Sequence, residues 1–272
     1  IAVIDHNPRL EEYVTCAFPS VRTVANGGQR GLSGARNTGL GFASGDIVAF
    51  LDDDAAAEPD WIARMRRQYE DETVVGLGGG VVPVWEAGKP KWFPAEFNWV
   101  VGCSYLGLPE EVAPIRNPIG CNMSFRRRVH GQIGGFREGM GRTANDAYGC
   151  EETEYFIRMR QANPSHKVLL EPAMKVHHHV PADRGRWSYF AKRCKAEGRS
   201  KTMVVDEVGA GAGLSAERLY VLKVLPSGVL RGLREAVLGR DIWGIARAGG
   251  IVAGLGYTAY GYFGARLKNA RG

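Results

Sequence analysis

The chain has 272 residues, of which 44% are hydrophobic and 24% charged, proportions typical of a globular protein. No segment has the roughly 20 strongly apolar residues of a membrane span. The nearest, residues 248–265, is interrupted by six glycines and three tyrosines. Five scattered cysteines form no C-x-x-C pair, which argues against a zinc site or a disulfide framework and favours a reducing, cytoplasmic compartment.

Charge is unevenly distributed along the chain. Residues 1–183 hold 19 Lys and Arg against 23 Asp and Glu, whereas residues 184–272 hold 16 against 6. The basic second part is either a solvated helical surface or a region that meets anionic lipid or nucleic acid. No nucleic-acid recognition motif accompanies the run Arg126–Arg128, so we interpret it as a solvated helix start and expect no nucleic-acid partner.

Short apolar runs alternate with helical patterns over the first third of the chain, which predicts a mostly parallel sheet with crossover helices. The sequence opens within an apolar run that lacks an initiator Met, so we expect an upstream segment. The expected strands are 1–4, 21–25, 47–51 and 73–82, and the expected helices are 9–18, 33–42 and 59–69.

The rest of the chain changes character twice. Residues 83–118 contain six prolines and many aromatic residues, which predicts irregular structure around a binding groove. Strands are then expected at 122–125, 167–170 and 174–178, and helices at 127–133, 151–161, 187–197, 216–224 and 242–267. We therefore expect an α/β domain over residues 1–182, followed by a basic helical C-terminal region over residues 183–272.

Three adjacent carboxylates, Asp52, Asp53 and Asp54, follow what reads as a buried apolar strand. Ligands of α/β proteins usually bind beyond the carboxyl ends of parallel strands, and clustered carboxylates need a compensating cation. Oxygen ligands of this kind suit Mg²⁺ or Mn²⁺ held jointly by protein and substrate phosphates. A solvated turn that caps the next helix is the alternative, and the strand context favours the metal site.

A second acidic cluster, Glu151-Glu152-Thr153-Glu154, opens a predicted helix. Acidic side chains are favoured at a helix N-terminus, so capping alone could explain them. A carboxylate beside a metal–diphosphate site can also act as the general base for transfer to a hydroxyl.

Five ordered motifs between residues 1 and 190 resemble those of the family 2 glycosyltransferases, which have the GT-A fold. They are G-L-S-G-A-R-N-T-G-L, A-S-G-D-I-V-A-F-L-D-D-D, G-C-N-M-S-F-R-R, G-C-E-E-T-E and H-H-H-V-P. The resemblance implies a Rossmann-type sheet flanked by helices, with a C-terminal helical extension. It also implies a nucleotide-diphosphate-sugar donor, a divalent metal (Mn²⁺ or Mg²⁺) and inversion at the anomeric carbon.

The resemblance assigns the metal and the base. Asp52 and Asp54 match the D-x-D positions, with Asp54 as the more direct metal ligand and Asp52 facing the ribose or the metal. The H-x-V-P pattern places the third metal ligand at His178. Glu152 stands where the family usually has an aspartate, and it is assigned as general base.

Donor-binding positions follow from the same motifs. Arg36 and Asn37 lie one turn into a helix after a Gly-rich loop, where backbone N–H groups and a guanidinium can hold a diphosphate. Glu151 and Asp53 are placed with the donor-binding residues, and the role of Asp53 is open.

Two further positions are assigned by resemblance. Asp5 matches a residue that contacts the base, although capping before Asn7-Pro8 would also explain it. Asn122 matches a strand that faces the donor sugar and the acceptor, with a core strand as the alternative. Trp92 and Trp99 are assigned equally to acceptor contact and to core packing.

The function expected from these features is sugar transfer to a hydroxyl of a sugar or lipid-linked acceptor, in cell-envelope or other glycoconjugate biosynthesis. The family's first strand has no counterpart, so a non-catalytic nucleotide-sugar-binding or scaffold protein is the alternative. Residues 242–267 read as an interfacial helix that could hold the enzyme on the inner face of the membrane. Packing of this helix against the core is the competing interpretation.

Overall fold

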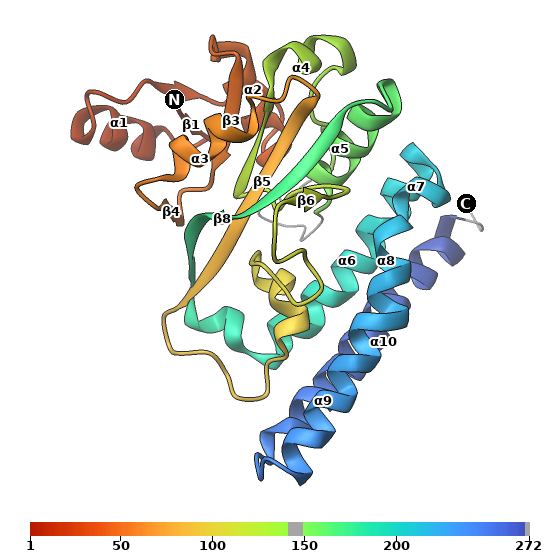
Figure 1. Cartoon of the computed structure of the whole chain (residues 1–272). Coiled ribbons are helices and arrows are strands. Elements are labelled where there is room, and N and C mark those ends of the chain that lie inside the picture. Colours follow the sequence, from red (N-terminus) through yellow and green to blue (C-terminus); the bar gives the residue numbers. More distant parts are fainter. Residues whose placement is uncertain (141–148, 270–272) are drawn as a thin grey trace.

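A computed structural model describes residues 1–140 and 149–269 of the chain. Its centre is a six-stranded sheet in the order β3-β7-β5-β8-β4, with β6 paired to β8 outside this path (Figure 1). The strands are β3 (Ile47–Leu51), β4 (Ala55–Ala57), β5 (Val74–Trp85), β6 (Ala113–Pro114), β7 (Asn122–Arg126) and β8 (Lys167–Val180).

The α/β class is confirmed, but the central sheet is mixed and not mostly parallel as expected. β5 and β8 pair in parallel, whereas β3 and β5 both pair antiparallel with β7. β3, β5 and β8 therefore run in the same direction, as strands joined by crossovers should. β7 enters from an irregular segment that offers no parallel crossover, so it inserts between β3 and β5 in the opposite direction.

β3 also differs from the buried strand that we expected. None of its residues is buried, and Leu51 is 45% exposed. Among the described residues β3 has one hydrogen-bonded neighbour in the sheet, β7. Because β3 lies at the edge of the sheet, fewer elements pack against it. The three aspartates that follow it are therefore partly or fully exposed to solvent.

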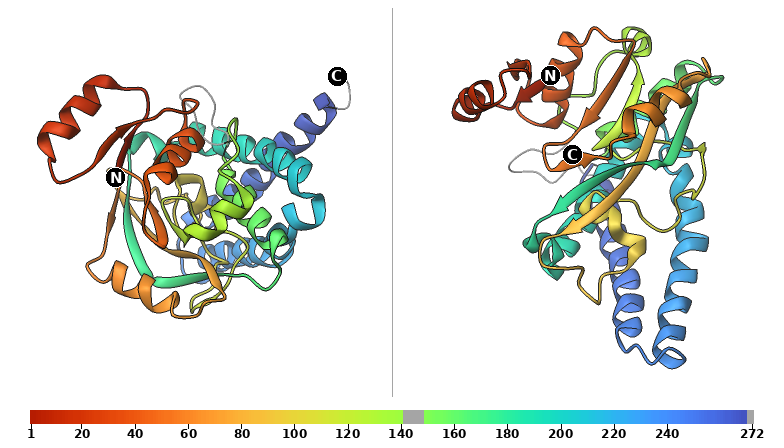
Figure 2. Two further views of the ribbon diagram at one scale, coloured as in Figure 1. Left: turned by 90° about the horizontal axis from the view of Figure 1, so that it is seen from above. Right: turned by 60° about the vertical axis from the view of Figure 1, so that its left-hand side comes forward.

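A separate two-stranded parallel sheet contains β1 (Ala2–Ile4) and β2 (Thr23–Ala25), joined by α1 (Pro8–Ala17). α1 begins where the side chain of Asn7 accepts a hydrogen bond from the backbone N–H of Leu10. α2 (Leu32–Phe42) follows the Gly-rich loop. Figure 2 shows these elements together on one side of the molecule.

Helices cover both faces of the central sheet. α3 (Trp61–Gln68) and the residue after it bury Met65 and Tyr69 in one hydrophobic cluster with β5. α5 (Glu151–Ala162) buries Tyr155 and Phe156 in another cluster with β7. The shorter helices are α4 (Arg127–Ile133) and the 3₁₀ segments η1 (Ala95–Val101) and η2 (Ala182–Gly185).

The chain beyond η2 is helical, as expected. Its helices are α6 (Trp187–Val208), α7 (Ala210–Gly213), α8 (Ser215–Leu219), the π-helical turn η3 (Tyr220–Val224), α9 (Leu225–Val237) and α10 (Trp243–Asn269). α9 was not expected, because Pro226 and Gly228 look like turn residues. Proline is tolerated in the first helical turn, and Gly228 is a buried contact point.

Close backbone contacts hold the C-terminal helices together. A Cβ atom at Gly198 of α6 would lie 2.0 Å from the carbonyl oxygen of Thr258 of α10. A Cβ at Gly244 of α10 would lie 2.1 Å from the carbonyl oxygen of Gly232 of α9. α9 and α10 form an antiparallel hairpin that extends beyond the α/β part (Figures 1 and 2). None of the described helices is both long enough and apolar enough to span a membrane.

Candidate active site

The three aspartates form the link between β3 and β4. Asp54 Oδ1 lies 3.2 Å from His178 Nε2, and its Oδ2 lies 3.6 Å from Arg184 Nη1. The hydrogen bond to His178 lowers the pKa of Asp54, and the charge of Arg184 adds to this effect against the opposing effect of burial. Asp54 therefore remains ionised, while Asp53 beside it is exposed.

Strand alternation separates the three adjacent histidines. His178 is buried within β8, whereas His177 and His179 are exposed on the opposite face. The register of β4 and β8 places Ala55 opposite His178, and so brings the preceding Asp54 to the imidazole. His177 lies outside this cluster, with Nε2 3.2 Å from Glu58.

A buried ion pair joins α2 to the start of α5. Arg36 Nη1 donates to Glu151 Oε1 at 2.6 Å, and Arg36 Nη2 lies 3.7 Å from Asp52 Oδ1. Burial alone would lower the pKa of Arg36, but the carboxylates of Glu151 and Asp52 outweigh it and raise the pKa. Glu151 Oε2 is buried and has no hydrogen-bond partner among residues 1–140 and 149–269. That oxygen can accept a hydrogen bond from a ligand.

The next residue, Glu152, differs from Asp54 in that its pKa is raised and not lowered. Burial and repulsion by Glu151 raise its pKa from 4.5 to about 8, although Arg36 opposes the shift. The preceding residue, Cys150, has a φ of 73°, which is uncommon for a residue other than glycine. This turn starts α5 so that Glu151 and Glu152 both border the same cavity.

A cavity of about 500 Å³ connects these groups. Its lining includes Arg36, Asp52, Glu151, Glu152 and His178. The cavity is thus lined by residues that lie far apart in the sequence. They come from α2, the β3–β4 turn, α5 and β8. Asp54 is linked to this lining through His178.

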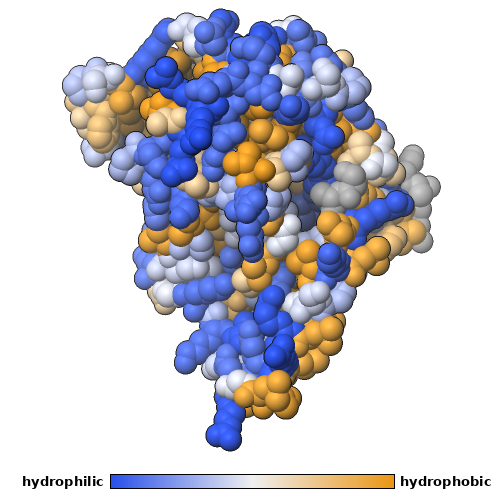
Figure 3. Space-filling view, in the orientation of Figure 1, coloured by the Kyte–Doolittle hydropathy of each residue, from blue (hydrophilic) through white to orange (hydrophobic). Residues whose placement is uncertain are grey.

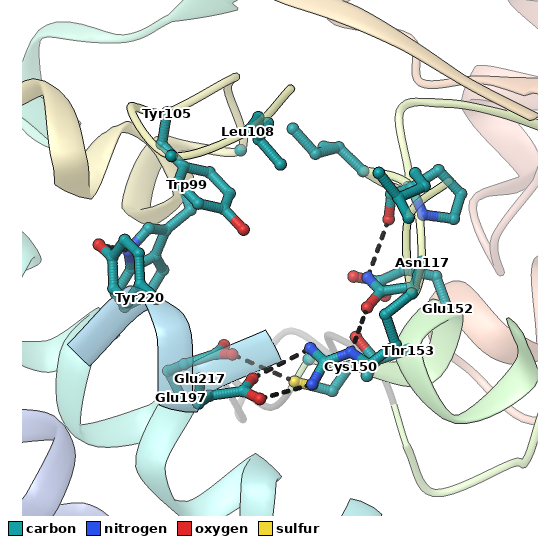
Figure 4. Close-up of a pocket in the computed structure, with 18 of the residues that line it drawn as sticks. Trp99, Tyr105, Leu108, Asn117, Cys150, Glu152, Thr153, Glu197, Glu217 and Tyr220 are labelled. Carbon is teal, nitrogen blue, oxygen red and sulfur yellow. Dashed lines mark hydrogen bonds and ion pairs between the residues drawn. The ribbon is translucent and has the colours of Figure 1, made fainter. Parts of the chain in front are cut away.

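The opposite side of the cavity is aromatic. Figure 4 shows Trp99, Tyr105 and Tyr220 across the hollow from Glu152. Trp99 Nε1 donates to Tyr220 Oη at 3.1 Å, and the Tyr105 and Tyr220 rings meet edge to face with centroids 5.6 Å apart. Trp92 instead packs among aromatic residues of the core, including Phe190. Trp92 therefore packs in the core, whereas Trp99 borders the cavity.

A charged network forms the third side of the cavity. Arg116 donates two hydrogen bonds to Glu217, at 2.5 and 3.0 Å. Lys201 Nζ lies 2.8 Å from Glu217 and 3.1 Å from Glu197. Burial would raise the pKa of Glu217, but the charges of Lys201 and Arg116 outweigh this and lower it to about 2. The network joins the loop before β7 to α6 and α8.

Four predicted donor-binding residues lie outside the cavity lining: Asp5, Asn37, Asp53 and Asn122. The Asn37 amide exchanges two hydrogen bonds with the backbone of Phe136, each 2.8 Å long. Asp5 accepts from Asn26 Nδ2 at 2.7 Å and from the backbone N–H of Gly31 at 2.9 Å. Both side chains position loops around α2.

Asn122 is placed in the interior and does not face a sugar site. It is fully buried, its Oδ1 accepts from Trp61 Nε1 at 2.8 Å, and its Nδ2 donates to the carbonyls of Gly80 and Met174. All of its polar atoms are engaged by protein. The assignment was drawn from the motif alone, and burial on β7 gives the asparagine a structural role.

The predicted set of three metal ligands is not assembled. Within residues 1–140 and 149–269, no group of three or more His, Cys, Asp and Glu side chains is arranged to hold a metal ion. Asp54 and His178 lie together, but Asp52 faces Arg36. A pair of protein ligands fits an ion that completes its coordination with water and substrate phosphates, as Mg²⁺ commonly does.

Several cavity residues were not identified from the sequence. They are Tyr105, Arg116, Glu197, Lys201, Glu217 and Tyr220. None belongs to a recognisable motif, and four lie on the C-terminal helices. The six-proline segment did predict a binding groove, and Tyr105 and Arg116 lie in that segment.

Residues 1–134 match the model of the family described as Glycosyl transferase family 2. The chain belongs to this family of sugar-transferring enzymes. The resemblance inferred from the five motifs is thereby confirmed. The matched region contains Arg36 and the three aspartates but ends before Glu152.

Two curated relatives extend the match. The chain is 34% identical over 208 residues to the glucosyl-dolichyl phosphate glucuronosyltransferase of Haloferax volcanii, covering 75% of this chain and 66% of that protein. It is 28% identical over 182 residues to the succinoglycan biosynthesis protein ExoM of Rhizobium meliloti, covering 66% and 55%. The chain therefore spans only part of the length of these two relatives.

A solved structure shows the same fold. The mannosyltransferase PcManGT from Pyrobaculum calidifontis, in complex with GDP-Man and Mn²⁺, has a TM-score of 0.56 and 16% sequence identity. The similarity covers 94% of this chain and 75% of that one. At this identity the likeness establishes the fold, which is the GT-A fold expected from the motifs.

Proposed function

We propose that the chain transfers a sugar from a nucleotide-diphosphate sugar to a hydroxyl group of a sugar or lipid-linked acceptor, with a divalent metal ion and inversion at the anomeric carbon. The observation that carries this proposal is the single cavity bordered by Arg36, by Glu152 and by an aromatic wall. It offers a binding site for an anionic donor, a base, and a surface for a second sugar.

The donor diphosphate would bind at the Arg36 end. Arg36 is held by Glu151 and Asp52, so its guanidinium is oriented before the donor arrives. Glu151 Oε2, which lacks a hydrogen-bond partner in the described part of the chain, can accept from a donor hydroxyl. A buried, preoriented cation and acceptor of this kind discriminate strongly for polar ligands.

Glu152 would act as general base. The acceptor oxygen attacks the anomeric carbon while its proton passes to the Glu152 carboxylate, and the bond from that carbon to the diphosphate oxygen breaks. A single displacement inverts the anomeric centre. A base with a pKa of about 8 is well matched to a reaction near neutral pH, because it holds a proton firmly and is still partly ionised.

Asp54 and His178 would hold the metal ion. When bound, a divalent ion neutralises charge that develops on the leaving diphosphate. The ionised Asp54 and the neighbouring imidazole provide oxygen and nitrogen ligands of the required kind. The Mn²⁺ in the complex of PcManGT, a protein of the same fold, supports the use of a divalent ion.

The aromatic wall would receive the acceptor. Trp99 and Tyr105 border the cavity opposite Glu152, and aromatic rings pack well against the apolar faces of pyranose rings. The Haloferax volcanii relative is named for a glucosyl-dolichyl phosphate substrate, which supports a lipid-linked acceptor. We therefore place the reaction in glycoconjugate biosynthesis at the cytoplasmic face of a membrane.

The proposal is tested by incubating the full chain with Mn²⁺, a panel of radiolabelled nucleotide sugars and a polyprenyl-phosphate-linked glucose. Labelled lipid product whose new bond has the anomeric configuration opposite to that of the donor supports it. Donor binding in calorimetry without product, with all donors and acceptors, would instead favour a non-catalytic nucleotide-sugar-binding protein. Retained configuration would contradict the single displacement.

A further inference from the structure

The outer surface of the helical hairpin is strongly apolar. Leucines and a valine recur at helical spacing from α8 to the end of α9 and are 45–78% exposed. They are Leu219, Leu222, Leu230, Leu233 and Val237. The opposite face of α9 is buried at Leu225, Gly228 and Gly232. The helix thus has apolar residues on its packed face and again on its free face.

α10 repeats this arrangement. Apolar residues of α10, together with Ile242 just before it, are 57–73% exposed. They are Ile242, Ile245, Val252, Tyr260, Phe263 and Leu267. Figure 3 shows apolar residues near the tip and along one edge of this hairpin, beside hydrophilic residues. We name the two sets of exposed residues the hairpin stripes. Large apolar side chains exposed along both helices are typical of a site of interaction.

Positive charge accompanies the hairpin stripes. Residues 218–268 contain eight Lys and Arg against two acidic residues. Both acids, Glu235 and Asp241, are paired with Arg247, at 2.7 and 2.6 Å. Five exposed basic residues have no ion pair with any described residue: Arg218, Lys223, Arg234, Arg240 and Lys268. Lys223 and Arg234 lie four residues after Leu219 and Leu230, so they border the stripe on α9.

We propose that the α9–α10 hairpin lies in the surface of an anionic lipid bilayer, with the hairpin stripes among the acyl chains and the basic residues at the headgroups. Apolar residues flanked by Lys and Arg suit the interfacial region of a membrane, where long basic side chains reach back to lipid phosphates. Trp243, near the hairpin tip, is the residue type enriched at that depth.

The hairpin also leads to the cavity. Leu219, at the end of α8, belongs to the hairpin stripes and also borders the cavity. Tyr220 and Val224 of η3 border the cavity as well. A lipid whose head group enters the cavity could therefore leave its chain along the stripe. This continuity deepens the proposed function, because it names a membrane-embedded lipid as the acceptor. The docking surface itself does not depend on sugar transfer.

The test is flotation of the full chain with vesicles of phosphatidylcholine alone or of equimolar phosphatidylcholine and phosphatidylglycerol, at low and high salt. The wild type should float with the anionic vesicles and less so at high salt. Joint replacement of Leu230, Leu233 and Val237 by serine should lower the partition coefficient at least about tenfold. Ile62→Ser is the matched control, since Ile62 is 63% exposed on α3, outside the hairpin.

Three controls separate the explanations. Circular dichroism should show the triple serine variant folded, because the replaced side chains are exposed. Calorimetry with a nucleotide sugar should be unchanged, so a failure of docking and a failure of the proposed function remain distinguishable. Absence of flotation by the wild type, equal flotation of the triple variant, or a dimer that this variant dissociates in sedimentation experiments would overturn the proposal.

Discussion

Asp54 Oδ1 and His178 Nε2 lie 3.2 Å apart, although the two residues are 124 positions apart in the sequence. The backbone N–H of His179 donates to the carbonyl oxygen of Asp54 at 2.8 Å, so strand pairing fixes this contact. The pair couples the turn after β3 to the end of β8. This is the pair that we propose as protein ligands of the metal ion.

Replacing Asp54 by alanine should lower metal-dependent donor affinity by about 100-fold, because the ionised ligand is lost. The measurement is calorimetric titration of a nucleotide sugar with and without Mn²⁺. Asp53→Ala is the control, since that neighbour is exposed. Unchanged metal-dependent binding in the Asp54 variant would remove this residue from the metal site.

Replacing Glu152 by glutamine should reduce turnover by roughly 10²-fold while donor affinity stays nearly constant, because the amide cannot take up the acceptor proton. The comparison variant is Glu70→Gln, which alters an exposed glutamate. Near-normal turnover of Glu152→Gln would assign the base to another group.

The pH dependence of the wild type offers a separate check on Glu152. Burial and the charge of Glu151 raise its pKa to about 8, so the carboxyl is protonated below that pH. A base must be ionised, and kcat/KM should therefore rise with pH and level off above about 8. A value of kcat/KM that stays constant between about pH 6 and 9 would contradict this role.

Gly120 should be required for the position of Arg36. A Cβ atom at Gly120 would lie 2.7 Å from Arg36 Nη2, so alanine must displace the guanidinium. We expect Gly120→Ala to weaken donor binding by about tenfold, a typical cost of overpacking. Gly131→Ala is the matched control, because a Cβ there meets nothing within 4 Å. Equal donor affinity in both variants would show that Arg36 does not bind the donor.

Glu217 should stabilise the fold only above acidic pH. Lys201 and Arg116 outweigh burial and lower its pKa from 4.5 to about 2. The unfolded chain therefore binds the proton first as the pH falls, and the stability that Glu217 contributes is complete above pH 4.5 and is lost toward pH 2.

We expect Glu217→Gln to lower the free energy of unfolding at neutral pH by about 2 kcal/mol, allowing for partial solvent screening. The variant should also lose less stability than the wild type on acidification. Denaturant titrations at several pH values measure both effects, with Glu12→Gln as the surface control. If the free energy of unfolding depends on pH in the same way for Glu217→Gln and the wild type, the ion pairs of Glu217 do not contribute to stability.

Local pattern was sufficient for most elements of the fold. The predicted strand at 47–51 and the helix at 127–133 have the same bounds as β3 and α4. Periodicity and turn residues set such elements, because they depend on neighbours along the chain. The motif resemblance likewise identified the family, and its H-x-V-P pattern pointed to His178 among the three histidines.

Other features depended on contacts between distant segments. The sequence could not indicate that β7 inserts between β3 and β5, because strand order depends on which edges remain free for pairing. It did not reveal that Asn122 is consumed by interior hydrogen bonds, or that Arg116 and Glu217, 101 positions apart, meet at the cavity. Packing between distant segments determines which of these residues meet. It also brings residues of α9 and α10 to the cavity lining.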